Sequence, residues 1–322
     1  MDLELRRGHE ALSPVRLAVA FALVLSGCAP SEAPPRGTLF FGGDVMFGRL
    51  LPEGFRPYDT LPARPRDAAD LAVVNLETAL CDPDALERDA LAAQRHLLVA
   101  PTAKARRLRD AGVDVAVVAN NHALDCGAES LERTLRALDA VGIVSVGART
   151  RGDGSFPTVV VERPWGEVVI TAATMHPSPI PSSSLVPAVL FERDRDAWLD
   201  HVRALRARHL DALLVVSLHW GAEGRVRPLG EQRALAKELA RAGVDVIFGH
   251  GSHTRQPVER MGETVAIFGA GNLHFDSREE HGMIEIAVVR DGARPRIAAI
   301  RAEGEAPPRH GRRLQSSPAW GK

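Results

Sequence analysis

The chain has 322 residues, of which 45% are hydrophobic and 25% are charged, and its formal net charge at pH 7 is -1. This length and hydrophobic share are enough for one substantial buried core, or at most two modest ones, which excludes a disordered protein. Because the net charge is close to zero, the chain lacks the basic excess that drives binding to nucleic acid, and we expect no nucleic-acid partner.

The first segment of the chain is expected to direct export. Arg16 precedes an apolar run over residues 17–25, which is too short to cross a bilayer as a helix and is typical of a signal peptide. The tetrapeptide Leu25-Ser26-Gly27-Cys28 follows and resembles the lipobox of bacterial lipoproteins, whose cysteine carries the lipid. We therefore predict a lipoprotein signal peptide over residues 1–28, lipidation of Cys28, and an exported protein anchored to a membrane of the cell envelope. The alternative is an ordinary apolar segment that ends in cysteine.

The next segments separate a tether from a folded domain. Residues 29–37 are rich in proline and have no apolar period, so we expect a flexible linker. From Thr38 onward, short apolar runs alternate with amphipathic helical patterns, which is typical of βαβ units around a largely parallel or mixed sheet. We predict one α/β domain over residues 38–290, followed by a C-terminal strand and tail over residues 291–322.

The expected elements follow from apolar spacing and β-branched runs. The strands are predicted at 39–42, 71–75, 113–119, 143–146, 158–162, 168–172, 212–218, 244–248, 265–268 and 283–289. The helices are predicted at 102–111, 129–141, 195–208 and 231–242. Gly112, Gly142 and Gly243 each follow a predicted helix, where a left-handed cap favours glycine.

Polar residues follow several of these strands at the point where each strand ends. In open α/β sheets, binding sites form at the carboxyl ends of strands. Carboxylate, amide and imidazole groups from several loops are what a binuclear hydrolytic metal site needs. Each such residue alone is more often a cap or a satisfied polar group, but burying so many without a partner would cost free energy. We therefore predict a metal centre whose ligands are Asp44, Glu77, Asn121, His219, His250 and His253.

The same motifs, in this order, resemble those of the CapA/PgsA capsule-synthesis family, a branch of the calcineurin-like metallophosphoesterases. The matching residues are Gly43-Asp44-Val45-Met46-Phe47-Gly48-Arg49, Asn75-Leu76-Glu77, Asn120-Asn121-His122, His219-Trp220-Gly221, Gly249-His250 to His253, and Gly271-Asn272 to Asp276. The resemblance covers residues 38–286 and implies a single four-layered α/β sandwich of the calcineurin-like type.

The resemblance also implies roles for individual residues. Asp44 would ligate one of two divalent ions, Glu77 would take the bridging position, and Asn121 would ligate the second ion. The three histidines would complete both coordination spheres, and the ions could be manganese, iron, zinc or magnesium.

The residues around the ligands would serve catalysis and substrate binding. His122 matches the catalytic histidine of the superfamily. Asp125 would orient His122, or else would cap the helix expected near Ala128. Arg49 and Asn120 would contact an anionic substrate, although a surface salt bridge is the commoner role of an arginine.

The sequence departs from the family pattern at positions next to the ligands. Cys126 stands where the family usually has tyrosine, and Gly251 and Ser252 stand where it often has a second histidine and a proline. Gly224 replaces a frequent aromatic residue. These changes spare the ligands but alter the wall of the site, so the resemblance says more about metal binding than about substrate.

The remaining cysteines form an even pair if Cys28 is lipidated. Cys81 and Cys126 follow Glu77 and His122 by the same short interval, which places both on loops at one end of the sheet. We therefore suggest a Cys81–Cys126 disulfide at the rim of the site, with two unpaired thiols as the alternative.

The function implied by the resemblance is synthesis or export of an anionic envelope polymer such as poly-γ-glutamate, beside membrane-bound synthase subunits. The implied reaction is metal-assisted hydrolysis of a phosphoester. Two alternatives stay open: a membrane-anchored accessory protein that binds polymer without turnover, and an exported phosphatase or nucleotidase. The sequence lacks a Gly-x-Ser-x-Gly elbow and a Gly-x-Gly-x-x-Gly turn, which argues against a serine hydrolase and a dinucleotide site.

Overall fold

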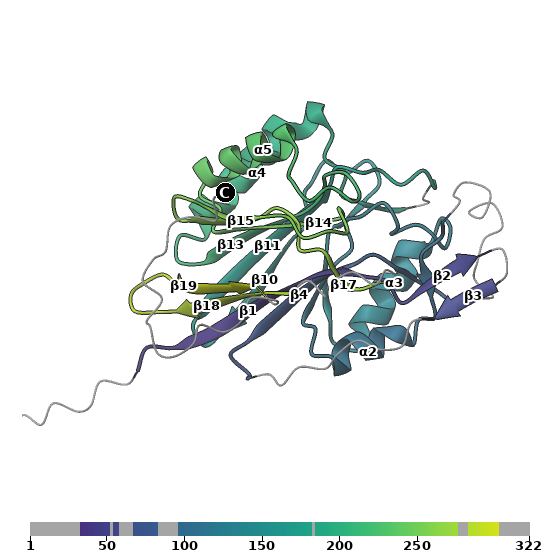
Figure 1. Ribbon diagram of the computed structural model, residues 1–322, viewed down its shortest axis with the longest axis horizontal. Helices are drawn as coiled ribbons and strands as arrows, with labels where there is room; N and C mark the ends of the chain where they lie inside the picture. The colour runs from purple at the N-terminus through teal and green to yellow at the C-terminus, as the bar shows by residue number, and fades with distance from the viewer. Residues whose placement is uncertain are drawn as a thin grey trace, which may run out of the picture. The chain divides into compact units, whose positions relative to one another are not determined.

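The structure is a computed structural model that describes residues 33–51, 54–57, 67–82, 96–181, 184–275 and 283–302 (Figure 1). Its strands and helices belong to one compact unit, Pro34–Lys322. The predicted signal peptide, Cys28 and residues 303–322 of the predicted C-terminal segment lie outside the described residues, and the predicted domain boundaries remain predictions. None of the helices in the described ranges has the length and hydropathy that a membrane span requires.

The first sheet places β1 at its centre. In order, its strands are β19 (Arg296–Ala302), β18 (Met283–Val289), β1 (Arg36–Val45), β4 (Leu71–Leu76), β7 (Val115–Val117) and β8 (Val144–Val146), and β17 (Asn272–His274) also pairs with β1. The strands β1, β4, β7 and β8 are parallel, so their carboxyl ends lie at one edge of the sheet.

The second sheet has the same kind of parallel centre. In order, its strands are β10 (Thr158–Arg163), β11 (Gly166–Thr174), β13 (Leu213–His219), β14 (Val246–His250), β16 (Thr264–Ile267) and β15 (Val258–Met261). The strands β11, β13, β14 and β16 are parallel, and the outer strands β10 and β15 are antiparallel to their neighbours.

Helices and short strand pairs complete the fold. The helices are α2 (Lys104–Asp110), α3 (Ser130–Asp139), α4 (Arg195–Arg208), which a 3-10 turn η2 (Glu192–Asp194) precedes, and α5 (Gly230–Arg241). The short pairs are β2 (Gly48–Leu51) with β3 (Gly54–Pro57), β5 (Ala79–Leu80) with β6 (Val99–Ala100), and β9 (Ala148–Thr150) with β12 (Leu185–Pro187).

The inner core lies between the two sheets. Successive side chains of a strand point to opposite faces, so each sheet contributes every second residue to this core. Val73 of β4 packs in the cluster that also contains Ile170 of the second sheet, whereas its neighbour Val74 belongs to a different cluster. The rings of Phe41 and Phe248 meet across the two sheets with centroids 5.0 Å apart.

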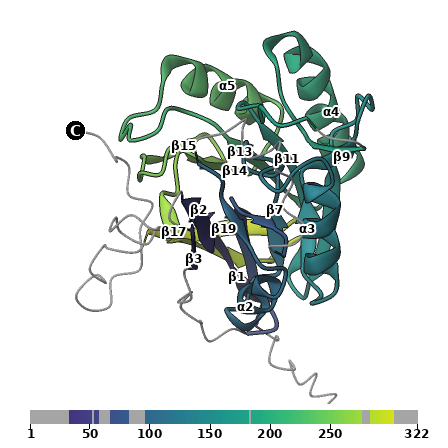
Figure 2. The same cartoon turned by 90° about the vertical axis from the view of Figure 1, so that its right-hand side faces the viewer.

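The outer faces of both sheets are covered by helices. Val74 packs with Leu108 of α2 and Leu131 of α3, while Val216 of the second sheet packs with Trp198 of α4 and Leu239 of α5. Figures 1 and 2 show α4 and α5 together on one side and α2 and α3 apart from them. The unit is therefore a four-layered α/β sandwich, which confirms the predicted fold class.

The predicted elements agree with the structure where the sequence pattern is long. The helix predicted at 195–208 has the bounds of α4, and the other three helices end within two residues of their predicted ends. Gly112, Gly142 and Gly243 have φ of 90°, 72° and 86°, which confirms the left-handed caps. The strand predicted at 113–119 is shorter, because only residues 115–117 pair in register. The short strand pairs were not predicted, since they are too short for a period to be visible.

Candidate metal centre

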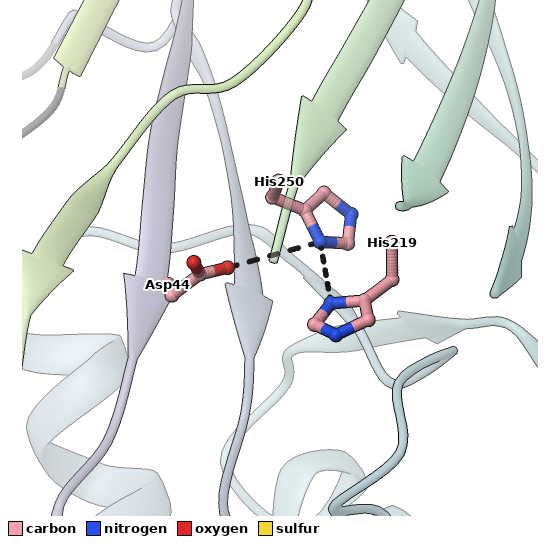
Figure 3. Close-up of side chains that lie close together, drawn as sticks. All are labelled: Asp44, His219 and His250. Atoms are coloured by element: carbon pink, nitrogen blue, oxygen red, sulfur yellow. Dashed lines mark hydrogen bonds and ion pairs between the residues drawn. The ribbon is translucent and has the colours of Figure 1, made fainter. Parts of the chain in front are cut away.

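Strand register brings the candidate ligands together from both sheets. Parallel pairing sets Asp44 beside Asn75 in the first sheet and His219 beside His250 in the second. Across the sheets, Asp44 Oδ1 lies 3.8 Å from His250 Nδ1, and Figure 3 shows Asp44, His219 and His250 pointing toward one another. All three side chains are buried. The carboxyl ends of the central strands therefore form one site.

Two overlapping groups of side chains could hold a cation. Asp44, His219 and His250 form one group, and Asp44, Glu77 and His253 form the other, with the ligand atoms of each group all within 4.8 Å of one another. Asp44 belongs to both groups. Glu77 Oε1 also lies between them, 3.8 Å from His219 Nε2 and 3.7 Å from His253 Nε2. Two neighbouring cations that share carboxylates need this overlap.

The state of the donor atoms fits bound cations. The side-chain oxygen of Asn121 is buried and makes no hydrogen bond. Nδ1 of His219 lies 3.2 Å from Nδ1 of His250, and Nε2 of His250 lies 2.9 Å from Ser217 Oγ. With the far nitrogen of His250 bonded to a hydroxyl, its Nδ1 can present a lone pair to an ion. Among the described residues, no lysine or arginine pairs with the buried carboxylates of Asp44 and Glu77.

The electrostatics of the site separate groups that hold protons from groups that do not. Burial would raise the pKa of Asp44, but the hydrogen bond and charge of His253 hold it well below its usual range. Burial raises the pKa of Glu77 to about 8, against the opposing charge of His253. Burial would lower the pKa of His253, but Glu77 and Asp44 raise it to about 10.

The two histidines at the ends of β13 and β14 are neutral at physiological pH. Burial lowers the pKa of His250 to about 4, and burial and His250 lower the pKa of His219 well below its usual value. Neutral imidazole is the form that binds metal ions. In contrast, the protons on Glu77 and His253 must leave when a cation binds.

His122 and Asp125 form a pair at the edge of these groups. His122 Nδ1 lies 2.6 Å from Asp125 Oδ2, which also accepts a hydrogen bond of 2.7 Å from the backbone N–H of Leu98. His122 Nε2 faces Glu77 Oε1 at 3.9 Å. Burial would lower the pKa of His122, but the charge and hydrogen bond of Asp125 raise it above its usual value. Glu129 is the N-cap of α3, so Asp125 is in the orienting position and not in the capping one.

The two predicted substrate contacts have different outcomes. Asn120 is fully buried, and its side-chain nitrogen donates to Asn75 Oδ1 and to the carbonyl of Leu76. Its amide is therefore occupied inside the protein, and the predicted contact of Asn120 with substrate does not fit its position. Arg49 lies in β2 opposite Arg56, but its side chain lies outside what the structure describes, so its predicted role stays a prediction.

Residues with no predicted role also contribute to the site. Asn75 donates to both Asp44 and Glu77, and Asn272 Oδ1 lies 3.0 Å from Nδ1 of His253. Ser217 stands two residues before His219, a strand spacing that could have indicated that both face the site. For Asn75 and Asn272, membership in the family motifs was the available signal.

His176 is a further neighbour that the sequence analysis missed. It follows β11, the strand that pairs with β13, and its ring lies edge-on to His219 with centroids 5.6 Å apart. Its Nε2 lies 2.8 Å from the carbonyl of Gly221. A histidine two residues beyond a central strand end was the signal that could have drawn attention to it.

Gly251 explains one departure from the family pattern. Its N–H donates to both carboxylate oxygens of Asp44, at 3.2 and 3.1 Å. Its φ is 93°, and a Cβ at this position would lie 2.6 Å from the ring of His219. Glycine is therefore required here by both backbone conformation and space.

A disulfide links the segments that carry Glu77 and Asp125. Cys81 and Cys126 are both buried, their Cα atoms are 6.3 Å apart, and they form the pair suggested from the sequence. The bridge fixes the loop of the His122–Asp125 pair against the end of β4.

Comparisons with known proteins agree with this arrangement of motifs. The family model described as "Bacterial capsule synthesis protein PGA_cap" matches residues 38–277, more than half of the chain. A protein of Mycobacterium tuberculosis (strain H37Rv) named "Probable polyglutamine synthesis accessory protein" is 30% identical over 290 residues, which cover 74% of each chain. "Capsule biosynthesis protein CapA" of Bacillus anthracis is 27% identical over 254 residues, covering 74% of this chain and 60% of that protein.

Two further matches are shorter or weaker. "PGA biosynthesis protein CapA" of Bacillus subtilis (strain 168) is 29% identical over 174 residues, which cover 52% of this chain and 44% of that protein. A crystal structure of a hypothetical protein from Thermus thermophilus has a TM-score of 0.45 and 17% identity, covers 82% of this chain and 97% of its own, and adds no weight at that score. From the family model and the similarity to the Mycobacterium protein, the chain belongs to the bacterial capsule synthesis protein family PGA_cap.

Proposed function

We propose that this capsule synthesis protein is a metal-dependent hydrolase of the phosphoesterase type that acts in the synthesis or export of an anionic capsular polymer. The observation that carries the proposal is the pair of overlapping ligand groups sharing Asp44, with His122 Nε2 facing the same cluster. Structural polar clusters rarely combine buried ligand groups with an oriented histidine beside them.

Two divalent cations, of manganese, iron, zinc or magnesium, would occupy the site. When bound, such a pair lowers the pKa of water and offsets the charge of a phosphoryl group. The chain's contribution is to hold the ions, and the side chains that would do so are Asp44, Glu77, Asn121, His219, His250 and His253.

His122 would act on the leaving group. Asp125 accepts the hydrogen bond of Nδ1, which leaves the proton on Nε2 as the one available for transfer. Burial would lower the pKa of His122, but Asp125 raises it above its usual value, which favours the protonated imidazole that a general acid requires. His122 would therefore protonate the leaving oxygen, and Asp125 would keep the ring in place.

The place of action follows from the N-terminal sequence and from the relatives. The lipobox at Cys28 supports an exported lipoprotein on a membrane of the cell envelope. The relatives' names refer to capsule biosynthesis and polyglutamine synthesis, which supports a partnership with a membrane-bound polymer synthase. The substrate would be the anionic polymer or a phosphoester formed during its synthesis or export.

A second candidate function has its own support. The Mycobacterium relative is named as an accessory protein, which favours a membrane-anchored protein that binds polymer without turnover. A binder needs neither the proton on His122 nor the carboxylate that orients it. Substitution of His122 therefore separates the two functions.

The test uses the full-length chain with Cys28→Ser, which prevents lipidation. Hydrolysis of an aryl phosphodiester and an aryl phosphomonoester is measured with added Mn²⁺. His122→Ala should lower the rate by about 100-fold or more while metal binding persists. His209→Ala is the matched control, because His209 lies 2.6 Å from Glu167 at the other end of the second sheet and should leave the rate unchanged.

The outcomes separate the candidates. Turnover that depends on His122 but not on His209 supports the hydrolase. A folded wild-type chain that binds no metal and hydrolyses neither ester contradicts it and leaves the polymer-binding accessory role.

A further inference from the structure

One buried amide serves both carboxylates of the site. Asn75 is fully buried, and its Nδ2 donates to Asp44 Oδ1 at 2.8 Å and to Glu77 Oε2 at 3.3 Å. An amide nitrogen carries two hydrogens, so one is directed to each carboxylate. Because the amide is neutral, it satisfies these oxygens without cancelling the negative charge that attracts cations.

A second buried amide fixes the orientation of the first. Asn120 Nδ2 donates to Asn75 Oδ1 at 3.1 Å and to the carbonyl of Leu76 at 2.9 Å. Asn120 Oδ1 accepts the backbone N–H of His122 at 3.1 Å. With its oxygen held by Asn120, Asn75 must turn its nitrogen toward the carboxylates. The hydrogen bonds thus run in one direction, from the His122 backbone through both amides to Asp44.

We propose that Asn75 and Asn120 are positioning residues that hold the carboxylates of Asp44 and Glu77 in the geometry that binds cations and tie them to the loop of His122. The part of this inference that concerns cations rests on the proposed function. Removal of Asn75 takes away the donor that faces Glu77 Oε2 and leaves Asp44 Oδ1 with only the longer hydrogen bond of 3.2 Å from the Gly251 N–H. The two carboxylates are then less firmly held and can turn toward other partners. Residues that orient metal ligands typically contribute about 10- to 100-fold to metal affinity.

The test is a double-mutant cycle on the full-length chain with Co²⁺ as the probe, titrated by its visible absorption. Asn75→Ala should weaken Co²⁺ binding by about 10- to 100-fold and change the spectrum. Asn120→Ala should act in the same direction, and the double variant should be no worse than Asn75→Ala. The control is Thr264→Val, which removes a buried hydrogen bond of 2.6 Å to the Val244 carbonyl at the amino end of β16 and should leave the affinity unchanged.

The cycle is repeated on metal-free protein by urea unfolding. The losses in the free energy of unfolding of the two single variants should again not add. If Asn75→Ala does not fold, Asn75→Ser replaces it, and its single hydroxyl donor should give a smaller but measurable loss of Co²⁺ affinity. Wild-type affinity and spectrum in the Asn75 variant, or additive losses in both cycles, would overturn the inference. A wild-type chain that binds Co²⁺ but hydrolyses nothing would refute the hydrolase alone and leave this cycle to decide the positioning role.

Discussion

Removal of the Cys81–Cys126 disulfide should destabilise the protein by an amount that follows from its place in the chain. The bridge joins residues that are 45 positions apart. In the loop-entropy model, cross-linking a loop of this length lowers the entropy of the unfolded chain enough to contribute about 4 kcal/mol to stability. Both cysteines are buried, and alanine is the replacement of choice because its methyl side chain places no polar group in the core.

The assay is equilibrium urea unfolding of metal-free protein, comparing wild type with the double variant Cys81→Ala and Cys126→Ala. The free energy of unfolding should fall by about 4 kcal/mol, and Cys28→Ser, which leaves the bridge intact, should not change it. A loss below about 1 kcal/mol at an unchanged urea dependence would contradict this prediction, because it would mean that the bridge does not restrict the unfolded chain.

Three further predictions test the electrostatics and the packing of the site. Cation affinity should rise with pH between about 6 and 8, because the metal-free site holds protons on Glu77 (pKa about 8) and His253 (pKa about 10) that cations must displace. Calorimetry in buffers of different ionisation enthalpy should detect the release of these protons, and cation binding without proton release would contradict the prediction. Metal-free protein should lose about 3 kcal/mol of stability from His250 as pH falls from 6.5 to 4, because its pKa of about 4 makes the unfolded chain bind the proton more readily in that window. The urea midpoint of unfolding should therefore fall less with pH across this range in His250→Asn than in the wild type. Gly251→Ala should weaken Co²⁺ binding, because the added Cβ would lie 2.6 Å from the ring of His219, a candidate ligand. Gly224→Ala should lower stability without changing Co²⁺ affinity, because Gly224 has a φ of 72° but open space around it. Equal Co²⁺ affinities in the two variants would contradict this prediction.

The sequence pattern predicted an α/β fold and a set of candidate ligands at strand ends, and the family resemblance supplied the four-layered arrangement. A helix such as α4 shows its apolar face over several turns, so its bounds are visible in one dimension. His219 and His250 could be grouped because the strand ends of one parallel sheet share an edge. Asp44 lies at a strand end of the other sheet, so its place beside the two histidines depends on how the sheets pack. The bounds of α4 and the shared edge of His219 and His250 do not depend on the register between strands.

The roles of Asn75 and Asn120 could not be predicted in the same way. Their hydrogen bonds depend on which residues lie side by side in β1, β4 and the loop after β7, and that register is set by packing between the sheets. For the same reason Asn120 was expected at the substrate, although its amide is used within the core. The contact of His176 with Gly221 likewise joins loops from different strands.

In the proposed metal centre, two neighbouring cations share Asp44 as a ligand. The most direct measurement is the Mn²⁺ content and paramagnetic resonance spectrum of the full-length chain and of Asp44→Asn, after dialysis against Mn²⁺. We expect two equivalents with the signal of a spin-coupled pair in the wild type, and loss of that signal in the variant. A folded wild-type chain with at most one equivalent, or a variant that keeps the coupled pair, would contradict it.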